Sequence, residues 1–188
     1  MSKLYNVRMQ EELSYPVRAA LIKDQSQIFT VRASESQRAA LASRFALPAI
    51  SLLEGRFALH HERSGIICAT LTMYAAVTQT CVVTLDPFEA VIKDTAALRF
   101  VPEAAMRYVP GGDVQGEAEE DVTPDTLDSP DDIPYANDSI DLGAALAEQL
   151  ALALDPYPRK PGAALPEAAS DDSANPFAGL AARFAKPD

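Results

Sequence analysis

The feature of this chain that most restricts its fold is a two-residue alternation in RSGIICATLTMYAAVTQ, residues 63–79. Every second residue from Ala69 to Val77 is apolar, and the residues between them are threonine, tyrosine or alanine. Successive side chains of a β-strand point to opposite faces, so this pattern predicts a strand with one buried and one semi-polar face. Sheets with one covered face are typically antiparallel. We therefore expect an antiparallel sheet built around this strand.

The neighbouring sequence supplies further strands and the turns that connect them. Three more segments are rich in residues of high β-propensity: 28–31, 49–62 and 88–102. Arg63-Ser64-Gly65 suits a hairpin turn, and Asp86-Pro87 suits the next one. The expected sheet runs from about residue 28 to residue 102.

Two helices are expected to pack on this sheet. SESQRAALASRFAL predicts the first, because Ser34 and Gln37 have the spacing of a capping box. Residues 139–154 predict the second, with Asp138 or Ser139 as its N-cap. The second helix carries a stripe of leucines four residues apart, at Leu142, Leu146 and Leu150. The predicted fold class is α+β, an antiparallel sheet with two packed helices.

The acidic residues are concentrated in one part of the chain. Residues 1–112 carry 12 Lys and Arg against 10 Asp and Glu, whereas residues 113–141 carry 11 acids and no base. Proline and glycine are frequent there and aliphatic residues are scarce, so the segment cannot bury enough apolar surface to offset its ordering entropy. We expect a long acidic loop, inserted at residues 111–138. Unpaired charge runs usually only keep a segment open to solvent.

The remaining boundaries follow from composition. Residues 1–14 are expected to be an N-terminal extension and residues 15–158 the α+β domain. Residues 159–174 are rich in Pro, Ala and Asp and predict a linker, and residues 175–188 predict a short helical motif. That motif has two interpretations, a docking helix or a terminal helix that closes the core. No signal peptide or membrane-spanning run is found, which indicates a soluble, cytoplasmic protein without membrane association.

Catalytic motifs are not found in the sequence. There is no nucleophile elbow, no phosphate-binding loop and no dinucleotide fingerprint. His60 and His61 are adjacent in a predicted strand, point to opposite faces and cannot share one metal ion without a bulge. Cys68 lies in an apolar run and is interpreted as a core residue. The sequence predicts no enzyme, no metal and no cofactor.

Cys81 admits four interpretations: metal ligand, nucleophile, redox thiol or structural residue. No basic residue lies near it in the sequence, since the closest are Arg63 and Lys93, and no helix is predicted to begin beside it. These observations favour a structural cysteine. Direct contact with RNA would require a basic patch, and five residues are the first candidates for it: Arg32, Arg38, Arg44, Lys93 and Arg99.

Several short motifs occur in a fixed order along the chain. They contain Cys81, Leu85, Asp86 and Pro87, then Asp141 and Leu142, then Pro156 and Pro158, and last Asn175, Pro176 and Phe177. With this order, residues from about Tyr15 to Ala185 resemble the YceD family of large ribosomal RNA subunit accumulation proteins. The family pattern has Cys-x-x-Cys in the first motif, where this chain has Thr84 as the second residue of the pair. A metal site or dithiol switch would therefore need Cys68 as a substitute.

The resemblance implies a non-enzymatic factor that supports synthesis, processing or stability of the large-subunit (23S) ribosomal RNA in ribosome biogenesis. Its partner would be that RNA or a pre-ribosomal particle. A second hypothesis is an acidic escort, in which residues 113–141 shield a basic ribosomal protein or another assembly factor. The third, an enzyme of unrecognised chemistry, would require a pocket with convergent titratable groups.

Overall fold

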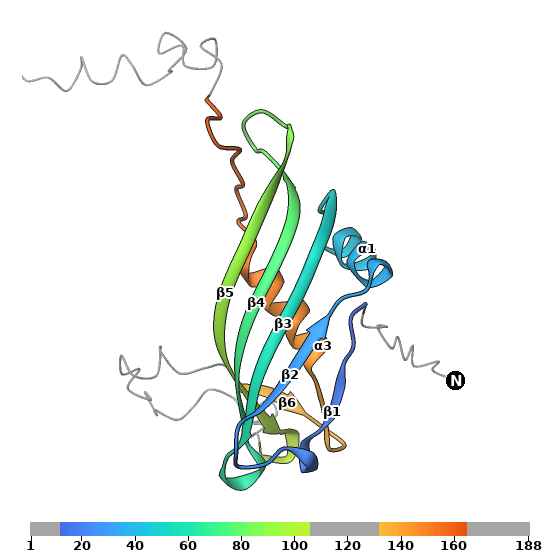
Figure 1. Ribbon diagram of the computed structural model, residues 1–188, viewed down its shortest axis with the longest axis vertical. Coiled ribbons are helices and arrows are strands. Elements are labelled where there is room, and N and C mark those ends of the chain that lie inside the picture. Colours follow the sequence, from blue (N-terminus) through green and yellow to red (C-terminus); the bar gives the residue numbers. More distant parts are fainter. Residues whose placement is uncertain (1–11, 106–131, 165–188) are drawn as a thin grey trace, which may run out of the picture.

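The computed structural model of this chain describes residues 12–105 and 132–164 (Figure 1). Three single turns of 3₁₀ helix, at Ala19–Leu21, Arg63–Gly65 and Glu103–Ala105, connect the longer elements. The strands and helices are, in chain order, β1 (Pro16–Arg18), β2 (Gln27–Arg32), α1 (Glu35–Arg44), β3 (Ala49–His61), β4 (Ile67–Thr80), β5 (Pro87–Pro102), β6 (Asp132–Tyr135), β7 (Ser139–Asp141) and α3 (Leu142–Ala153).

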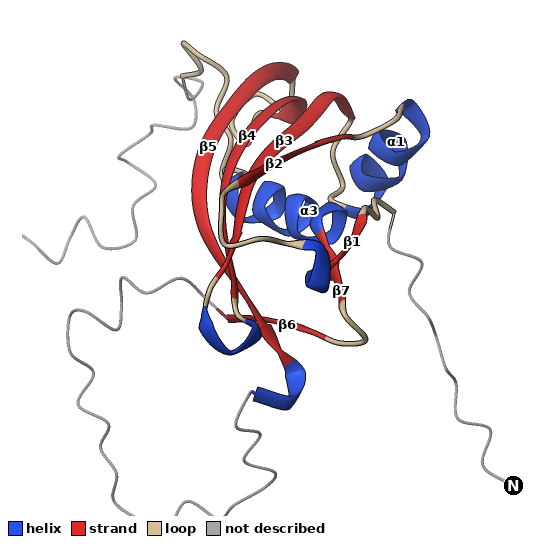
Figure 2. Cartoon of the chain, turned by 60° about the horizontal axis from the view of Figure 1, so that its bottom comes forward, coloured by secondary structure: helices blue, strands red, loops and turns tan. Residues whose placement is uncertain are grey.

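Five of these strands form one curved sheet in the order β2-β3-β4-β5-β6. The first four are antiparallel neighbours, and β6 runs parallel to β5 at the far edge. β1 and β7 form a separate antiparallel pair. Figure 2 shows α3 inside the curve of the sheet, with α1 beside it. The expected α+β fold, a mostly antiparallel sheet with two helices, is confirmed.

The covered face of the sheet is built by the alternation that the sequence displays. In β4 every second side chain from Ala69 to Val77 is at most 3% exposed. The leucine stripe of α3 packs against this face, and Leu142, Leu146 and Leu150 are all fully buried. Burial of apolar area on this scale is the main favourable term in folding, so this face holds the helices on the sheet.

The two helix starts differ in how well the sequence predicts them. The capping box of α1 is confirmed, because Gln37 N–H donates to Ser34 Oγ and Ser34 N–H donates to Gln37 Oε1. The cap of α3 is Asp141, and the expectation of Asp138 or Ser139 is wrong. The reason is that Ser139 is committed to the β1–β7 pair, so the helix begins only after that strand ends. Asp141 accepts bonds from the backbone N–H groups of Gly143 and Ala144.

The predicted acidic loop also needs a correction at its end. Residues 132–135 form β6, and Tyr135 Oη donates to Gly65 O at 2.6 Å. Ile133 and Tyr135 pack against the core, which gives this part of the acidic segment the apolar contacts that the rest of its sequence lacks. Residues 106–131 lie outside the described residues, as does the C-terminal motif with Asn175, Pro176 and Phe177.

Candidate functional site

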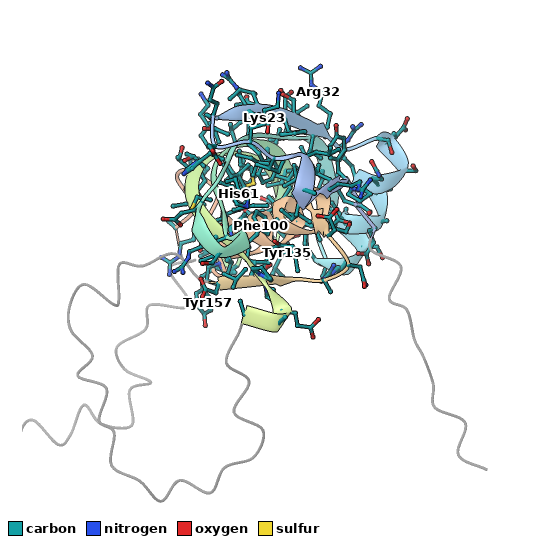
Figure 3. The ribbon with its side chains drawn as sticks, turned by 90° about the horizontal axis from the view of Figure 1, so that it is seen from below. Lys23, Arg32, His61, Phe100, Tyr135 and Tyr157 are labelled. Carbon is teal, nitrogen blue, oxygen red and sulfur yellow. The ribbon has the colours of Figure 1, made fainter. Side chains whose placement is uncertain are left out.

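The face of the sheet opposite α3 is covered by no helix among the described residues, and we call it the outer face (Figure 2). Strand register places Arg32, Glu54, Tyr74 and Lys93 in one row across β2, β3, β4 and β5. Arg32 Nε lies 2.9 Å from Glu54 Oε2, and Lys93 Nζ lies 5.5 Å from the centre of the Tyr74 ring. Figure 3 shows the Arg32 side chain pointing away from the body of the protein. This row therefore presents an aromatic ring and a cation to solvent.

The next row contributes a basic residue that the sequence analysis missed. It joins Thr30, Arg56, Thr72 and Thr95 across the same four strands. Arg56 is exposed and makes no ion pair with any residue that the structure describes. The sequence signal that could have identified Arg56 is the alternation of buried and exposed residues along β3. Arg56 lies between the buried residues Gly55 and Phe57 and therefore points to the outer face. Its guanidinium is available for an incoming anion.

The outer face carries nearly balanced charge. Arg99 lies at the end of this face where β6 joins the sheet, and it forms an ion pair with Asp132 at 3.4 Å. Threonine and alanine side chains fill the spaces between the charged residues, so the face is lined by short side chains. The strands of this face carry four basic residues, Arg32, Arg56, Lys93 and Arg99, and three acidic ones, Glu54, Glu89 and Asp132.

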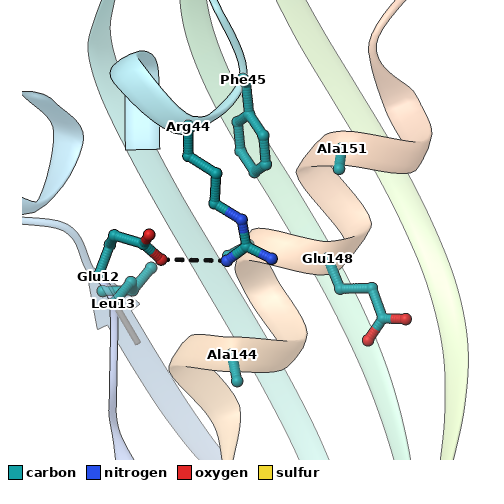
Figure 4. A pocket seen from close by; sticks show the side chains of 8 residues that line it. Glu12, Leu13, Arg44, Phe45, Ala144, Glu148 and Ala151 are labelled. Carbon is teal, nitrogen blue, oxygen red and sulfur yellow. Dashed lines mark hydrogen bonds and ion pairs between the residues drawn. The ribbon is translucent and has the colours of Figure 1, made fainter. Parts of the chain in front are cut away.

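The other two basic candidates, Arg38 and Arg44, lie on α1, in the layer that α1 and α3 form on the covered side of the sheet. Arg44 pairs with Glu12 at 3.0 Å and lines a pocket of about 290 Å³ between α1 and α3 (Figure 4). Arg38 donates to Ala33 O at 2.7 Å, at the start of its own helix. The structure thus brings Arg32, Lys93 and Arg99 to one face and leaves Arg38 and Arg44 apart from it.

The tip of the β4–β5 hairpin holds the first of the short sequence motifs. Cys81 N–H donates to Asp86 O, Leu85 N–H donates to Cys81 O, and Leu85 adopts a positive φ of 60°. The chain after α3 returns to this tip: Val82 N–H donates to Pro158 O at 2.9 Å, and Lys160 pairs with Asp86 at 3.6 Å. Two motifs more than seventy residues apart in the sequence are therefore in contact.

The motif around Asp141 has a structural task at the opposite end of the domain. Asp141 accepts bonds from Ser14 Oγ and from Tyr15 N–H, in addition to capping α3. A Cβ atom on Gly143 would lie 2.7 Å from Tyr15 N and 2.8 Å from Leu13 O. Only glycine lets the chain before β1 pass this close to the helix.

Cys81 and Cys68 sit in opposite environments. Cys81 is fully buried, and hydrogen bonds from Thr84 and from the backbone of Lys160 lower the pKa of its thiol from 9.0 to about 7. No nearby cation is needed for this shift, which is why the sequence did not predict it. Burial and a hydrogen bond to Glu62 instead raise the pKa of Cys68. The prediction that Cys68 is a core residue is wrong. Its side chain lies on the outer face of the sheet and is only half-buried.

A shared site for the two cysteines is excluded by geometry. They lie at opposite ends of β4, thirteen residues apart, which is about 40 Å at the rise of a strand. His60 is exposed and His61 is half-buried on the other face, as predicted for neighbours in a strand. Within residues 12–105 and 132–164, no group of three or more His, Cys, Asp or Glu side chains is placed to hold a metal ion.

These observations define a small α+β protein in which one face of the sheet is covered by helices and the other is covered by none of the described helices. Comparison with protein families matches residues 69–182 to the family described as large ribosomal RNA subunit accumulation protein YceD. The match covers more than half of the chain, and the chain belongs to this family. No curated protein and no solved structure matches the chain. None of the helices in the described part of the chain is both long and apolar enough to cross a membrane.

Proposed function

We propose that this protein is a non-enzymatic factor that supports the accumulation of large-subunit ribosomal RNA by contacting RNA directly through its outer face. The family assignment supports the link to the large ribosomal RNA subunit. The outer face supports direct contact, because Arg56, which has no ion-pair partner in the described part of the chain, lies beside an exposed Tyr74–Lys93 pair.

The chemistry of this face fits single-stranded RNA. Bases of an unpaired loop stack on exposed aromatic rings, and Arg and Lys side chains contact the phosphates. Tyr74 is 38% exposed and Lys93 stands over its ring, so a base can stack where the ammonium group now lies. Arg56 lies in the adjacent row, within reach of the phosphate that follows. Threonine hydroxyls around them can bond to the ribose 2′-hydroxyl.

The experiment is a binding titration of the full chain with a large-subunit ribosomal RNA transcript at several salt concentrations. Arg56→Ala and Lys93→Ala are each expected to weaken binding and to reduce the slope of log K against log salt by about one. Tyr74→Ala is expected to weaken binding with little change in slope, because stacking carries no counterion release. Arg44→Ala is the matched control, since this arginine lies in the helix layer and is paired with Glu12.

Two results would remove this proposal. One is the absence of binding at low salt by the wild-type chain. The other is an equal effect of Arg44→Ala and Arg56→Ala, which would mean that the outer face has no special role.

A second candidate function rests on the 11 acidic residues and no basic residue in 113–141. This segment would shield a basic ribosomal protein or another assembly factor. The structure refines the test, because residues 132–141 form β6 and β7 and supply the cap of α3. Replacing only residues 113–130 by a Gly/Ser linker spares these elements. Capture of basic ribosomal proteins that is unchanged by this replacement would reject the escort role.

A further inference from the structure

The outward edge of β5 is long and lacks a neighbouring strand over most of its length in the described structure. β5 spans Pro87–Pro102, and β6 pairs only with its last four residues, Arg99–Pro102. On the side away from β4, residues 87–98 thus have no strand beside them among residues 12–105 and 132–164. Such an edge is a template for pairing with another chain, because its backbone donors and acceptors are unpaired.

The direction of each backbone group along this edge follows from the hydrogen bonds and the register. Ala33 N–H donates to Leu53 O at 3.1 Å, so the odd-numbered residues of β3 from Leu53 onward bond to β2. In antiparallel sheets the bonded side alternates from one residue to the next. Through the registers of β3–β4 and β4–β5, the odd-numbered residues of β5 point their N–H and C=O groups to the free edge. Thr95 agrees with this assignment, since its N–H donates to the Asp94 side chain at 2.8 Å.

The side chains along the free edge are complementary to themselves. If a second copy of β5 lies antiparallel with Val91 opposite Val91, Glu89 of each copy faces Lys93 of the other. All three residues are exposed on the outer face, and Val91 is 59% exposed. The pairing joins two apolar side chains at the centre and forms one opposite-charge pair on each side, which is stabilising between directly opposite residues.

Other registers lose these contacts. If residue 90 or residue 92 faces its own copy instead of Val91, no opposite charges are brought together. If Glu89 or Lys93 faces its own copy, like charges are opposed. A centre at Asp94 would set Glu89 opposite Arg99, but the edge at Arg99 is already occupied by β6. The centre at Val91 uses residues 87–95 and stops short of β6.

We propose that this protein forms a symmetric dimer by antiparallel pairing of β5 with β5 of a second copy, centred on Val91. The two sheets then continue into one another, and the Tyr74–Lys93 pairs of both copies lie on the same outer face near the two-fold axis. The dimer does not depend on RNA binding, so each proposal can fail without the other.

Sedimentation velocity of the full chain over a range of protein concentrations, without RNA, tests the dimer. The wild-type chain is expected to pass from monomer to dimer as concentration rises. Lys93→Glu and Glu89→Lys each create two like-charge pairs and are expected to raise the dimer dissociation constant about tenfold or more. The double variant Glu89→Lys with Lys93→Glu restores opposite pairing and is expected to regain dimerisation. Glu148→Lys on α3 is the matched control for a charge reversal away from the edge.

A wild-type chain that stays monomeric at every concentration overturns the proposal. So does a double variant that is folded, as judged by circular dichroism, but dimerises no better than the single variants. A single variant that dimerises like wild type has the same consequence.

Val91→Pro tests the backbone pairing itself. The N–H of Val91 points to the free edge, so proline there removes no bond to β4 but places its ring where the second strand would lie. The variant is expected to remain folded and to lose the dimer. A dimer that survives this substitution is not formed by strand pairing at Val91, and the proposal is then wrong. If the variant does not fold, the charge-reversal series decides alone.

Discussion

The covered face and the outer face of the same sheet carry different information. Arg56 and Phe57 are neighbours in β3, yet Arg56 is exposed and Phe57 is 0% exposed between the sheet and the helix layer. The covered face is made of Phe, Leu, Ile, Val, Met and Ala, and it determines where the helices pack. The outer face is made largely of Thr and Ala, with Arg, Lys, Glu and Tyr among them, and no helix of the described structure packs on it. From Leu53 onward, the odd residues of β3 therefore carry the packing that holds the helices, whereas its even residues form the exposed outer face.

The two faces also differ in how tightly they are filled. On the covered face, a Cβ atom on Gly55 would meet Leu146 Cδ1 at 2.7 Å, so α3 approaches the sheet where a side chain is missing. The outer face has open space above Tyr74 and Lys93 instead. Substitutions on the covered face should therefore change the free energy of unfolding, and those on the outer face should change binding.

The largest effect is expected from the neighbouring pair in β3. Phe57→Ala is expected to lower the free energy of unfolding by about 3–5 kcal/mol, because it opens a cavity in a closely packed core. Arg56→Ala is expected to change it by less than about 0.5 kcal/mol, because its side chain is exposed and makes no ion pair with the described residues. Urea unfolding followed by circular dichroism measures both. Comparable losses in the two variants would show that the two faces do not divide the roles as stated.

A smaller loss of stability is expected when either of two tightly packed glycines, Gly143 and Gly55, is replaced by alanine. Gly143→Ala is expected to destabilise the fold by about 1–3 kcal/mol, since its Cβ would lie under 3 Å from the backbone of Leu13–Tyr15. Gly55→Ala meets side-chain atoms of Leu146 and Leu71, which can move more easily than backbone. It is therefore expected to be the milder of the two in the same urea assay. A larger loss of stability in Gly55→Ala than in Gly143→Ala would mean that the backbone before β1 shifts more easily than the core side chains around Gly55.

The sequence predicts the covered face better than the outer face, for a physical reason. Alternation and leucine spacing are local signals, so β4 and the stripe of α3 follow directly from them. The capping box at Ser34 is local as well. The parallel strand β6 is not, because its pairing with β5 depends on contacts between residues more than thirty positions apart.

Function-related residues depend still more on long-range contacts. Five basic residues were candidates, and only the register of four strands shows which of them share a face and that Arg56 lies among them. The lowered pKa of Cys81 likewise arises from hydrogen bonds, including one from the backbone of Lys160, which lies far along the chain. No pattern around Cys81 in the sequence contains that information.

The two cysteines are expected to respond differently to pH. Since the pKa of Cys81 is about 7 in the fold and 9.0 ordinarily, the unfolded chain holds more protons between these values. The free energy of unfolding should therefore gain a contribution from Cys81 as pH rises from 7 to 9, and this contribution is absent below pH 7. Urea unfolding across this range should show a shallower rise in Cys81→Ser than in wild type.

Cys68→Ser is the matched control, and it sharpens the comparison of the two faces. The pKa of Cys68 is raised in the fold, so this thiol adds no stability as pH rises and its loss should not flatten the curve. Thr84→Ala should also make the rise of the free energy of unfolding with pH shallower, but by less than Cys81→Ser does, because Thr84 is the main cause of the lowered pKa of Cys81. Equal pH dependence in wild type and Cys81→Ser would mean that the hydrogen bonds at the hairpin tip do not hold a thiolate. In that case Cys81 acts only as a buried apolar side chain that continues the covered face beyond Val77 and Gln79.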